Sequence, residues 1–131
     1  MDDGPLIERA KAFVKAIAAH APWAEIEAYY APGIMQEEFP NRLLPKGAIR
    51  NLDALREASA KGRQVISTQT VEIVRAISSN PCVALEAIWT GTLAVGVGEL
   101  KSGDQLRFAQ FCDFKDGLIW RQRNYDCFDP W

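Results

Sequence analysis

The chain has 131 residues, 48% hydrophobic and 24% charged, which suits one globular domain and excludes a disordered chain. Its 15 basic and 17 acidic side chains give a formal net charge of −2, which argues against a general nucleic-acid-binding protein. The single histidine, His20, excludes a histidine-rich metal site. The three cysteines lack the C-x-x-C spacing that zinc sites and disulfide frameworks use, so we expect no metal.

The amino terminus and the apolar runs indicate a protein without targeting or membrane-spanning segments. Residues 1–5 lack the basic start and apolar stretch of a signal peptide. No apolar run approaches the ~20 residues that span a bilayer. Three reduced cysteines are also the simplest interpretation for a cytosolic chain. We expect a single domain over residues 1–131, located in the cytoplasm.

The first third of the sequence has helical periodicity. Apolar residues between Leu6 and Ile17 recur at intervals of three and four, which predicts an amphipathic helix. A second, short helix is expected to begin after Pro22, because proline suits the first turn of a helix. Pro32-Gly33 is expected to end it.

The next segment predicts one short strand and a third helix. Residues 34–39 are expected to be extended and residues 41–46 to form a loop. The helix is expected to run from about Gly47 to Lys61, with Ile49 among its inward residues. Gly62 suits its carboxyl-terminal cap.

The second half of the sequence predicts four long strands. They are expected over residues 65–77, 83–95, 106–114 and 118–128, and turn signals separate them at 80–81, 102–104 and 115–117. Helices followed by a run of antiparallel strands indicate an α+β domain.

Alternation along the last strand separates its side chains into two faces. Ile119, Arg121, Arg123 and Tyr125 are expected on one face, and Trp120, Gln122, Asn124 and Asp126 on the other. Together with Gln110, the second set gives an apolar inner surface with a few polar groups. Such groups either satisfy one another or form a small-molecule pocket, and both interpretations stay open. Parity alone does not decide which face of residues 83–95 points inward.

Several segments occur in an order that resembles a known family. They are Tyr29-Tyr30-Ala31-Pro32, Phe39-Pro40, Gly47-Ala48-Ile49, Glu86-Ala87-Ile88-Trp89-Thr90-Gly91, Gly117-Leu118-Ile119 and Arg123-Asn124-Tyr125-Asp126. This order resembles the SnoaL-like branch of the nuclear transport factor two-like superfamily, which also contains ketosteroid isomerase and limonene epoxide hydrolase. The resemblance implies a cone-shaped domain, with a curved antiparallel sheet wrapped around three amino-terminal helices, and it implies a homodimer.

The resemblance also implies roles for individual residues. The isomerase pattern would place a tyrosine donor where Phe13 stands, a base at Glu38, and a protonated acid near Gln110. Two of these three roles are altered, so steroid isomerase activity is not expected. The SnoaL-type cyclase pattern makes Asp126 the acid/base candidate. The epoxide hydrolase pattern needs an Asp-Arg-Asp unit, for which Glu86 and Asp126 offer carboxylates but no arginine lies on the same inferred face.

The predicted function is binding of a hydrophobic small molecule, with acid/base catalysis of an isomerase, cyclase or hydrolase type and no cofactor. A non-catalytic ligand-binding or dimerisation module is the alternative. The candidate catalytic residues are Asp126 and Glu38. The candidate substrate-binding residues are Gln110, Asn124, Gln122, Tyr30, Trp89, Trp23, Glu86 and Phe13. We expect no nucleic acid and no membrane as partners.

Overall fold

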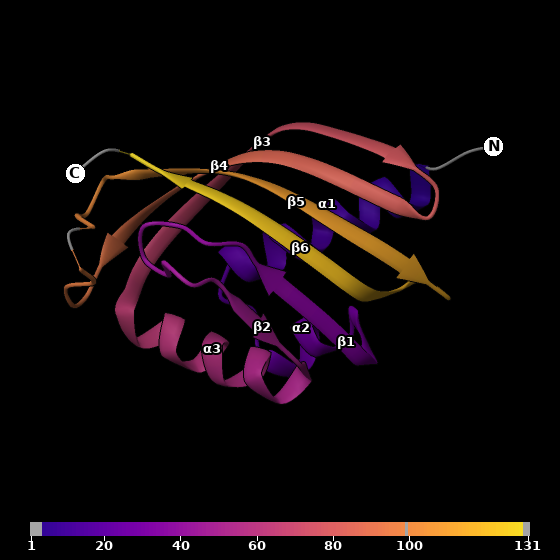
Figure 1. Cartoon of the computed structure of the whole chain (residues 1–131), viewed down its shortest axis with the longest axis horizontal. Helices are drawn as coiled ribbons and strands as arrows, with labels where there is room; N and C mark the ends of the chain where they lie inside the picture. Colours follow the sequence, from indigo (N-terminus) through magenta and orange to yellow (C-terminus); the bar gives the residue numbers. More distant parts are fainter. Residues whose placement is uncertain (1–3, 99, 130–131) are drawn as a thin grey trace.

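A computed structural model of the protein describes residues 4–98 and 100–129 (Figure 1). The elements follow in the order α1 (Gly4–Ala18), α2 (Trp23–Glu27), β1 (Tyr30–Glu38), β2 (Ala48–Arg50), α3 (Leu52–Val65), β3 (Ile66–Ser79), β4 (Cys82–Leu93), β5 (Gln105–Lys115) and β6 (Leu118–Phe128). Within the described residues, six strands form one sheet in the order β2-β1-β6-β5-β4-β3. β1 and β6 are parallel, and the other neighbouring pairs are antiparallel.

The long strands curve around the helices and leave the sheet unclosed (Figure 1). α1 packs against β3 and β4, while α3 contacts β1 and also β3, the strand at the opposite edge of the sheet. α3 therefore bridges the open side, which makes the domain the predicted α+β cone. The core between helix and sheet includes Phe13 of α1, Leu85 of β4 and Ile119 of β6, all fully buried. No described helix is long and apolar enough to cross a membrane.

The second helix is shorter than predicted. It follows Pro22 as expected but ends at Glu27, and Pro32-Gly33 lies inside β1. Proline is tolerated there because the pairing of β1 with β6 is irregular between Tyr30 and Met35, where ladder hydrogen bonds are not required.

The predicted third helix begins too early and ends too early. Residues 48–50 form β2, which pairs with β1 so that Arg50 lies opposite Gln36. The helix starts after Asn51, whose side chain accepts a hydrogen bond from the Ala54 N–H and so caps it. Ile49 is consequently 67% exposed rather than inward. α3 continues through Gly62 to Val65, because a single glycine costs a helix interior only ~1 kcal/mol.

The four long strands occur where they were predicted. The predicted alternation of inward and outward side chains, however, is wrong at the start of β6. Asp113 pairs with Arg121 whereas Phe114 pairs with Ile119, so the register shifts by one residue near Trp120. Ile119 is therefore buried and Trp120 is 37% exposed. The Arg121 guanidinium lies over the Trp120 ring, 4.4 Å from its centroid. Trp120 thus leaves the predicted inner set, and Ile119 leaves the predicted outer set.

Candidate functional site

A cavity of about 900 Å³ opens inside the cone, between the inner face of the sheet and the helices. Side chains of all three helices and of the strands line it, and most of its wall is apolar. Its size lies within the ~300–1,000 Å³ range that is usual for small-molecule sites. The predicted residues that line the cavity are Trp23, Tyr30, Glu38, Trp89, Gln110, Gln122, Asn124 and Asp126.

Two predicted residues lie elsewhere. Phe13 is fully buried in the core and contacts the rings of Tyr29 and Tyr30, with centroid distances of 5.5 and 5.3 Å, but does not line the cavity. Glu86 is exposed on the other face of β4, because Leu85 and the residues that alternate with it point inward. Neither side chain is placed where it would contact a molecule in the cavity.

Amide side chains from three strands form a hydrogen-bonded cluster on one wall. Gln122 Nε2 donates to Asn124 Oδ1 (2.8 Å) and to Gln110 Oε1 (3.4 Å), and Asn124 Nδ2 also donates to Gln110 Oε1 (3.3 Å). Gln36 Nε2 joins from β1 by donating to Asn124 Oδ1 (3.2 Å). Gln122 Oε1 is fully enclosed and without a hydrogen-bond partner among the described residues. The amides largely satisfy one another, which fixes this wall of the cavity.

Glu38 is held by an arginine and an amide. Arg50 Nη1 lies 2.9 Å from Glu38 Oε1 and also donates to Gln36 Oε1 (3.0 Å). Asn41 Nδ2 donates to the second carboxylate oxygen, Glu38 Oε2, at 2.9 Å. Both oxygens of Glu38 therefore have protein partners, which leaves them less free to exchange a proton with a bound molecule.

Asp126 has the opposite environment, two residues beyond Asn124 on β6. No residue that the structure describes forms a hydrogen bond or an ion pair with its carboxylate. Burial and then the negative charge of Glu38 raise the pKa of Asp126, the positive charge of Arg50 opposes them, and the resulting pKa is about 7. A carboxyl group with this pKa exchanges a proton readily at neutral pH.

The indole of Trp89 is held in the cavity wall by hydrogen bonds that run through two other lining residues. Trp89 Nε1 donates to Gln69 Oε1 (2.7 Å), and Gln69 Nε2 donates to the Ile17 carbonyl (3.0 Å). The Trp89 ring also covers the backbone of Gly91 so closely that a Cβ there would collide with it. Glycine at 91 thus lets the indole lie against the sheet instead of filling the cavity.

The sequence analysis missed several lining residues, among them Gln36 and Arg50, which contact the predicted polar groups. Arg50 was assigned to a helix, although Asn51 is a strong amino-terminal cap and signals that the helix starts one residue later. The sequence offered Glu86 and Asp126 as a pair of carboxylates without an arginine on their face. In the structure Glu86 lies on the outer face, and Arg50 binds Glu38 while its charge acts on Asp126. For Gln36, the only sequence feature that pointed to the cavity was its alternation with Glu38 along β1.

Comparisons with known proteins agree with this fold. The profile of the family described as SnoaL-like domain matches residues 10–122. A search of curated protein sequences found no match.

Solved structures of similar fold have low sequence identity. IdmH, a putative polyketide cyclase from Streptomyces antibioticus, is 12% identical, with a TM-score of 0.76 over 94% of this chain and 91% of that one. A Burkholderia pseudomallei ntf2-like protein of unknown function is 16% identical (TM-score 0.75; 96% and 92%). An M. tuberculosis LEH-like epoxide hydrolase is 17% identical (TM-score 0.69; 95% and 83%). The fold is thus shared with ntf2-like proteins, and the chain itself belongs to the SnoaL-like domain family.

Proposed function

We propose that this protein binds a hydrophobic small molecule in the cavity and acts on it by proton transfer through Asp126, without a cofactor. The observation that carries the proposal is a carboxyl group that faces an apolar cavity, has no protein partner among the described residues, and has a pKa of about 7. Perturbed carboxyl groups in clefts are typical of acid/base catalysts. A molecule of polyketide, terpenoid or steroid type with a carbonyl oxygen suits the apolar wall and the amide cluster.

The neighbours of Asp126 have supporting roles in this mechanism. The ionised Asp126 removes a proton from a carbon next to the carbonyl, and returns it at another position or after ring closure. The amides of Gln110 and Asn124 orient the substrate oxygen. Arg50, bound to Glu38, supplies positive charge near the enolate that forms. Glu38 is in this view a positioning residue for Arg50 rather than a second base.

The test is proton exchange in D₂O, because it detects enolisation before the true substrate is known. Polyketide-like, terpenoid and steroid-like ketones are incubated with the protein, and loss of the α-proton signals is followed by NMR. We expect Asp126→Asn to slow the exchange by about 10²-fold or more. We also expect the wild-type rate to rise with pH through about 7, as the Asp126 carboxyl loses its proton.

Asp113→Asn is the matched control, since it makes the same chemical change on the outer face of the neighbouring strand, where Arg123 holds the carboxylate. Its exchange rate is expected to equal that of the wild type. Equal rates for Asp126→Asn and the wild type on a ketone that the protein turns over would contradict the proposal.

Hydrolysis is a second candidate, favoured by Glu38, Arg50 and Asp126 together. Arg50 forms an ion pair with Glu38, and the charges of both act on Asp126. Asp126 has an oxygen free to take a proton from water. Opening of terpenoid epoxides, followed in H₂¹⁸O by mass spectrometry, separates this reaction from enolisation. A ligand-binding module without catalysis is the remaining alternative. It predicts tight binding of such compounds with neither exchange nor ring opening.

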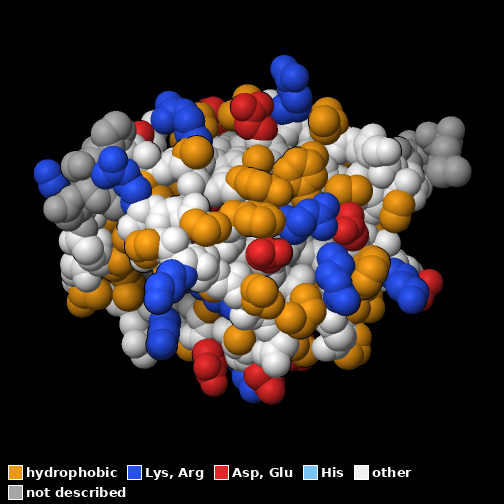
Figure 2. Space-filling view, viewed as in Figure 1, with side chains coloured by type: hydrophobic (Ala, Val, Ile, Leu, Met, Phe, Trp, Pro, Cys, Tyr) orange, Lys and Arg blue, Asp and Glu red, His pale blue; other side chains and the backbone are white. Residues whose placement is uncertain are grey.

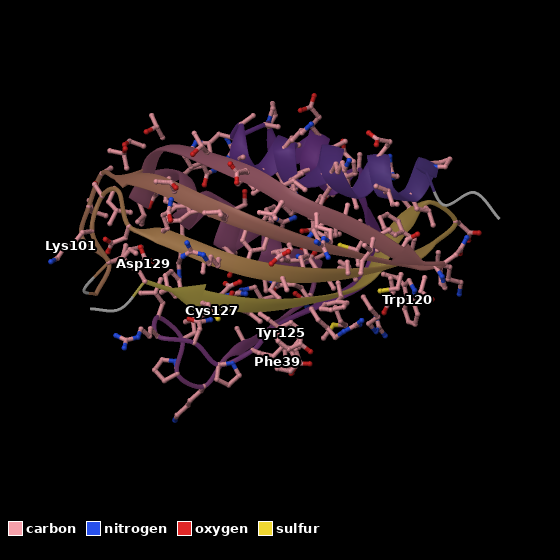
Figure 3. All side chains as sticks on the ribbon, turned by 90° about the horizontal axis from the view of Figure 1, so that it is seen from above. Phe39, Lys101, Trp120, Tyr125, Cys127 and Asp129 are labelled. Carbon is pink, nitrogen blue, oxygen red and sulfur yellow. The ribbon has the colours of Figure 1, made fainter. Side chains whose placement is uncertain are left out.

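We further propose a homodimer that forms through the outer face of the sheet. Tyr125 stacks on Phe39 (centroids 4.5 Å apart) and meets Phe111 edge-on (5.8 Å). Figure 3 shows Phe39, Tyr125 and Trp120 on the side of the sheet away from α1, and Figure 2 shows apolar side chains gathered across that face. Sedimentation velocity should give twice the monomer mass, and Tyr125→Glu should return it to the monomer. A monomeric wild type would contradict this.

A further inference from the structure

Tyr30 has a buried hydroxyl group, Oη, that forms no hydrogen bond with any described residue. The residue is 7% exposed and lines the cavity. Oη is also not sealed inside the protein, because Gln122 Oε1 is the fully enclosed side-chain atom without a partner in the described part of the chain. The hydroxyl therefore opens into the cavity. A buried hydroxyl without a partner is unfavourable, so water or a ligand must meet it.

Tyr30 lies at the end of the cavity that adjoins the packed core, because it pairs with Ile119 across β1 and β6. Tyr30 is near enough to Cys112 for their charges to interact, and Cys112 pairs with Gln122 across β5 and β6. Beyond that level, Phe114 and Ile119 belong to the packed core and do not line the cavity. Burial, and then the neighbouring Cys112, raise the pKa of Tyr30 above its ordinary value, so the phenol keeps its proton and can donate a hydrogen bond.

Asp126 lies further along the same cavity wall. It follows Gln122 by four residues on β6, which corresponds to about 13 Å at the usual strand rise. Between the two ends the wall includes the amide cluster on one side and apolar side chains such as Trp89 on another. The cavity thus has an unpartnered hydrogen-bonding group at each of two separated points, with a largely apolar space between them.

We propose that the cavity binds an elongated apolar molecule with an oxygen at each end, one accepting a hydrogen bond from Tyr30 Oη and the other bound at Asp126. This rests on the proposed function, which it narrows to substrates with two oxygens separated by about two linked or fused six-membered rings. Tyr30 selects such a molecule by its length, because a ligand with one oxygen leaves either Tyr30 or Asp126 without a partner.

Three biphenyls test the proposal by calorimetric titration above the pKa of Asp126. 4,4′-Dihydroxybiphenyl has an oxygen at each end, 4-hydroxybiphenyl has one oxygen, and 2,2′-dihydroxybiphenyl has two that lie close together. We expect the 4,4′ compound to bind about tenfold more tightly than the other two, which is the value of one additional hydrogen bond. The comparison of the two diols is made on the wild-type protein and depends on no variant.

Tyr30→Phe is expected to weaken the 4,4′ compound about tenfold and to change the affinity of 4-hydroxybiphenyl little, because that compound still reaches Asp126. Tyr29→Phe is the matched control, since Tyr29 is adjacent but does not line the cavity. It should leave all three affinities unchanged. Circular dichroism verifies that both variants fold.

Two results would overturn the proposal. Equal affinities for the 4,4′ and 2,2′ diols, or an unchanged 4,4′ affinity in Tyr30→Phe, would show that Tyr30 contacts water rather than ligand, while the proposed acid/base function would stand. Failure of all three biphenyls to bind would also overturn it. The proton-exchange comparison of Asp126→Asn with Asp113→Asn would then decide separately whether the proposed function holds.

Discussion

The two faces of β5 and β6 place carboxyl groups in opposite environments, although alternate residues of the same strands build both. On the outer face, Arg123 Nη1 donates to Asp113 Oδ2 at 2.9 Å. Partial burial by itself would raise the pKa of Asp113, but hydrogen bonds from Arg123 and Cys82 and the nearby positive charges lower it overall. On the inner face, Asp126 has no such partner among the described residues, and burial together with the charge of Glu38 raises its pKa to about 7.

This difference separates groups that stabilise the fold from groups that are available to a ligand. Asp113 is paired in the folded protein, and its negative charge therefore stabilises the fold. Enclosing Asp126 and Tyr30 without protein partners lowers the stability of the folded protein, and such unfavourable burial is typical of functional groups. Glu38 lies between these cases, because it faces the cavity but Arg50 and Asn41 hold both of its oxygens.

Removal of Arg50 should have the largest effect on stability. Arg50→Met leaves the Glu38 carboxylate without its counter-ion beside Asp126, so we expect a loss of about 3 kcal/mol of unfolding free energy above pH 7. The loss should be smaller near pH 5, where protonation of Asp126 removes the second negative charge beside Glu38. Urea unfolding at both values measures it. Adding Glu38→Gln should restore part of the stability, and no recovery would show that Arg50 acts by packing alone.

Asp126→Asn should raise stability at alkaline pH. The folded-state pKa of Asp126 is above its ordinary value of 3.8, so the favourable contribution of the protonated group is lost as pH rises toward about 7. We expect the variant to exceed the wild type by about 2 kcal/mol at pH 8 and to equal it near pH 4. Urea titrations across this range test the difference. A variant less stable than the wild type at pH 8 would mean that Asp126 is paired.

Asp113→Asn should show the opposite dependence with a smaller amplitude. The lowered pKa of Asp113 means that its favourable contribution is present above about pH 4 and is lost as pH falls through the folded-state value. For a partly exposed ion pair we expect a loss of about 1 kcal/mol at pH 7 that shrinks as the pH falls through the lowered pKa of Asp113. Equal pH profiles for Asp113→Asn and Asp126→Asn would remove the distinction between the two faces.

Tyr30→Phe should change stability least of all. The substitution removes a hydroxyl that has no described protein partner and keeps the ring that packs on Phe13 and Trp23. We expect the unfolding free energy to change by no more than ~1 kcal/mol. The melting temperature, measured by calorimetry without ligand, should equal or exceed that of the wild type. A clear fall in melting temperature would indicate a hydrogen bond that holds Oη in the folded protein.

Much of this protein was predictable from local pattern. The helical spacing from Leu6 to Ile17 and the four long strands follow from which side chains are apolar, and the order of the motifs indicated the SnoaL-like family. Asp126, Gln110, Gln122 and Asn124 were placed on one surface because β5 and β6 alternate regularly past residue 121.

The remaining features depend on how distant segments meet. The register shift near Trp120 reverses which residues at the start of β6 face the core, and single-strand alternation does not reveal it. Arg50 reaches Glu38 only because residues 48–50 pair with β1, and β1 reaches the cavity wall only through parallel pairing with β6. Periodicity reports the environment along one segment, so the sequence by itself determined the first helix, the four long strands, the family and the inner polar residues of β5 and β6. Tertiary structure decided the rest. In particular, it pairs Arg50 with Glu38 and leaves Asp126 and Tyr30 without hydrogen-bond partners among the described residues.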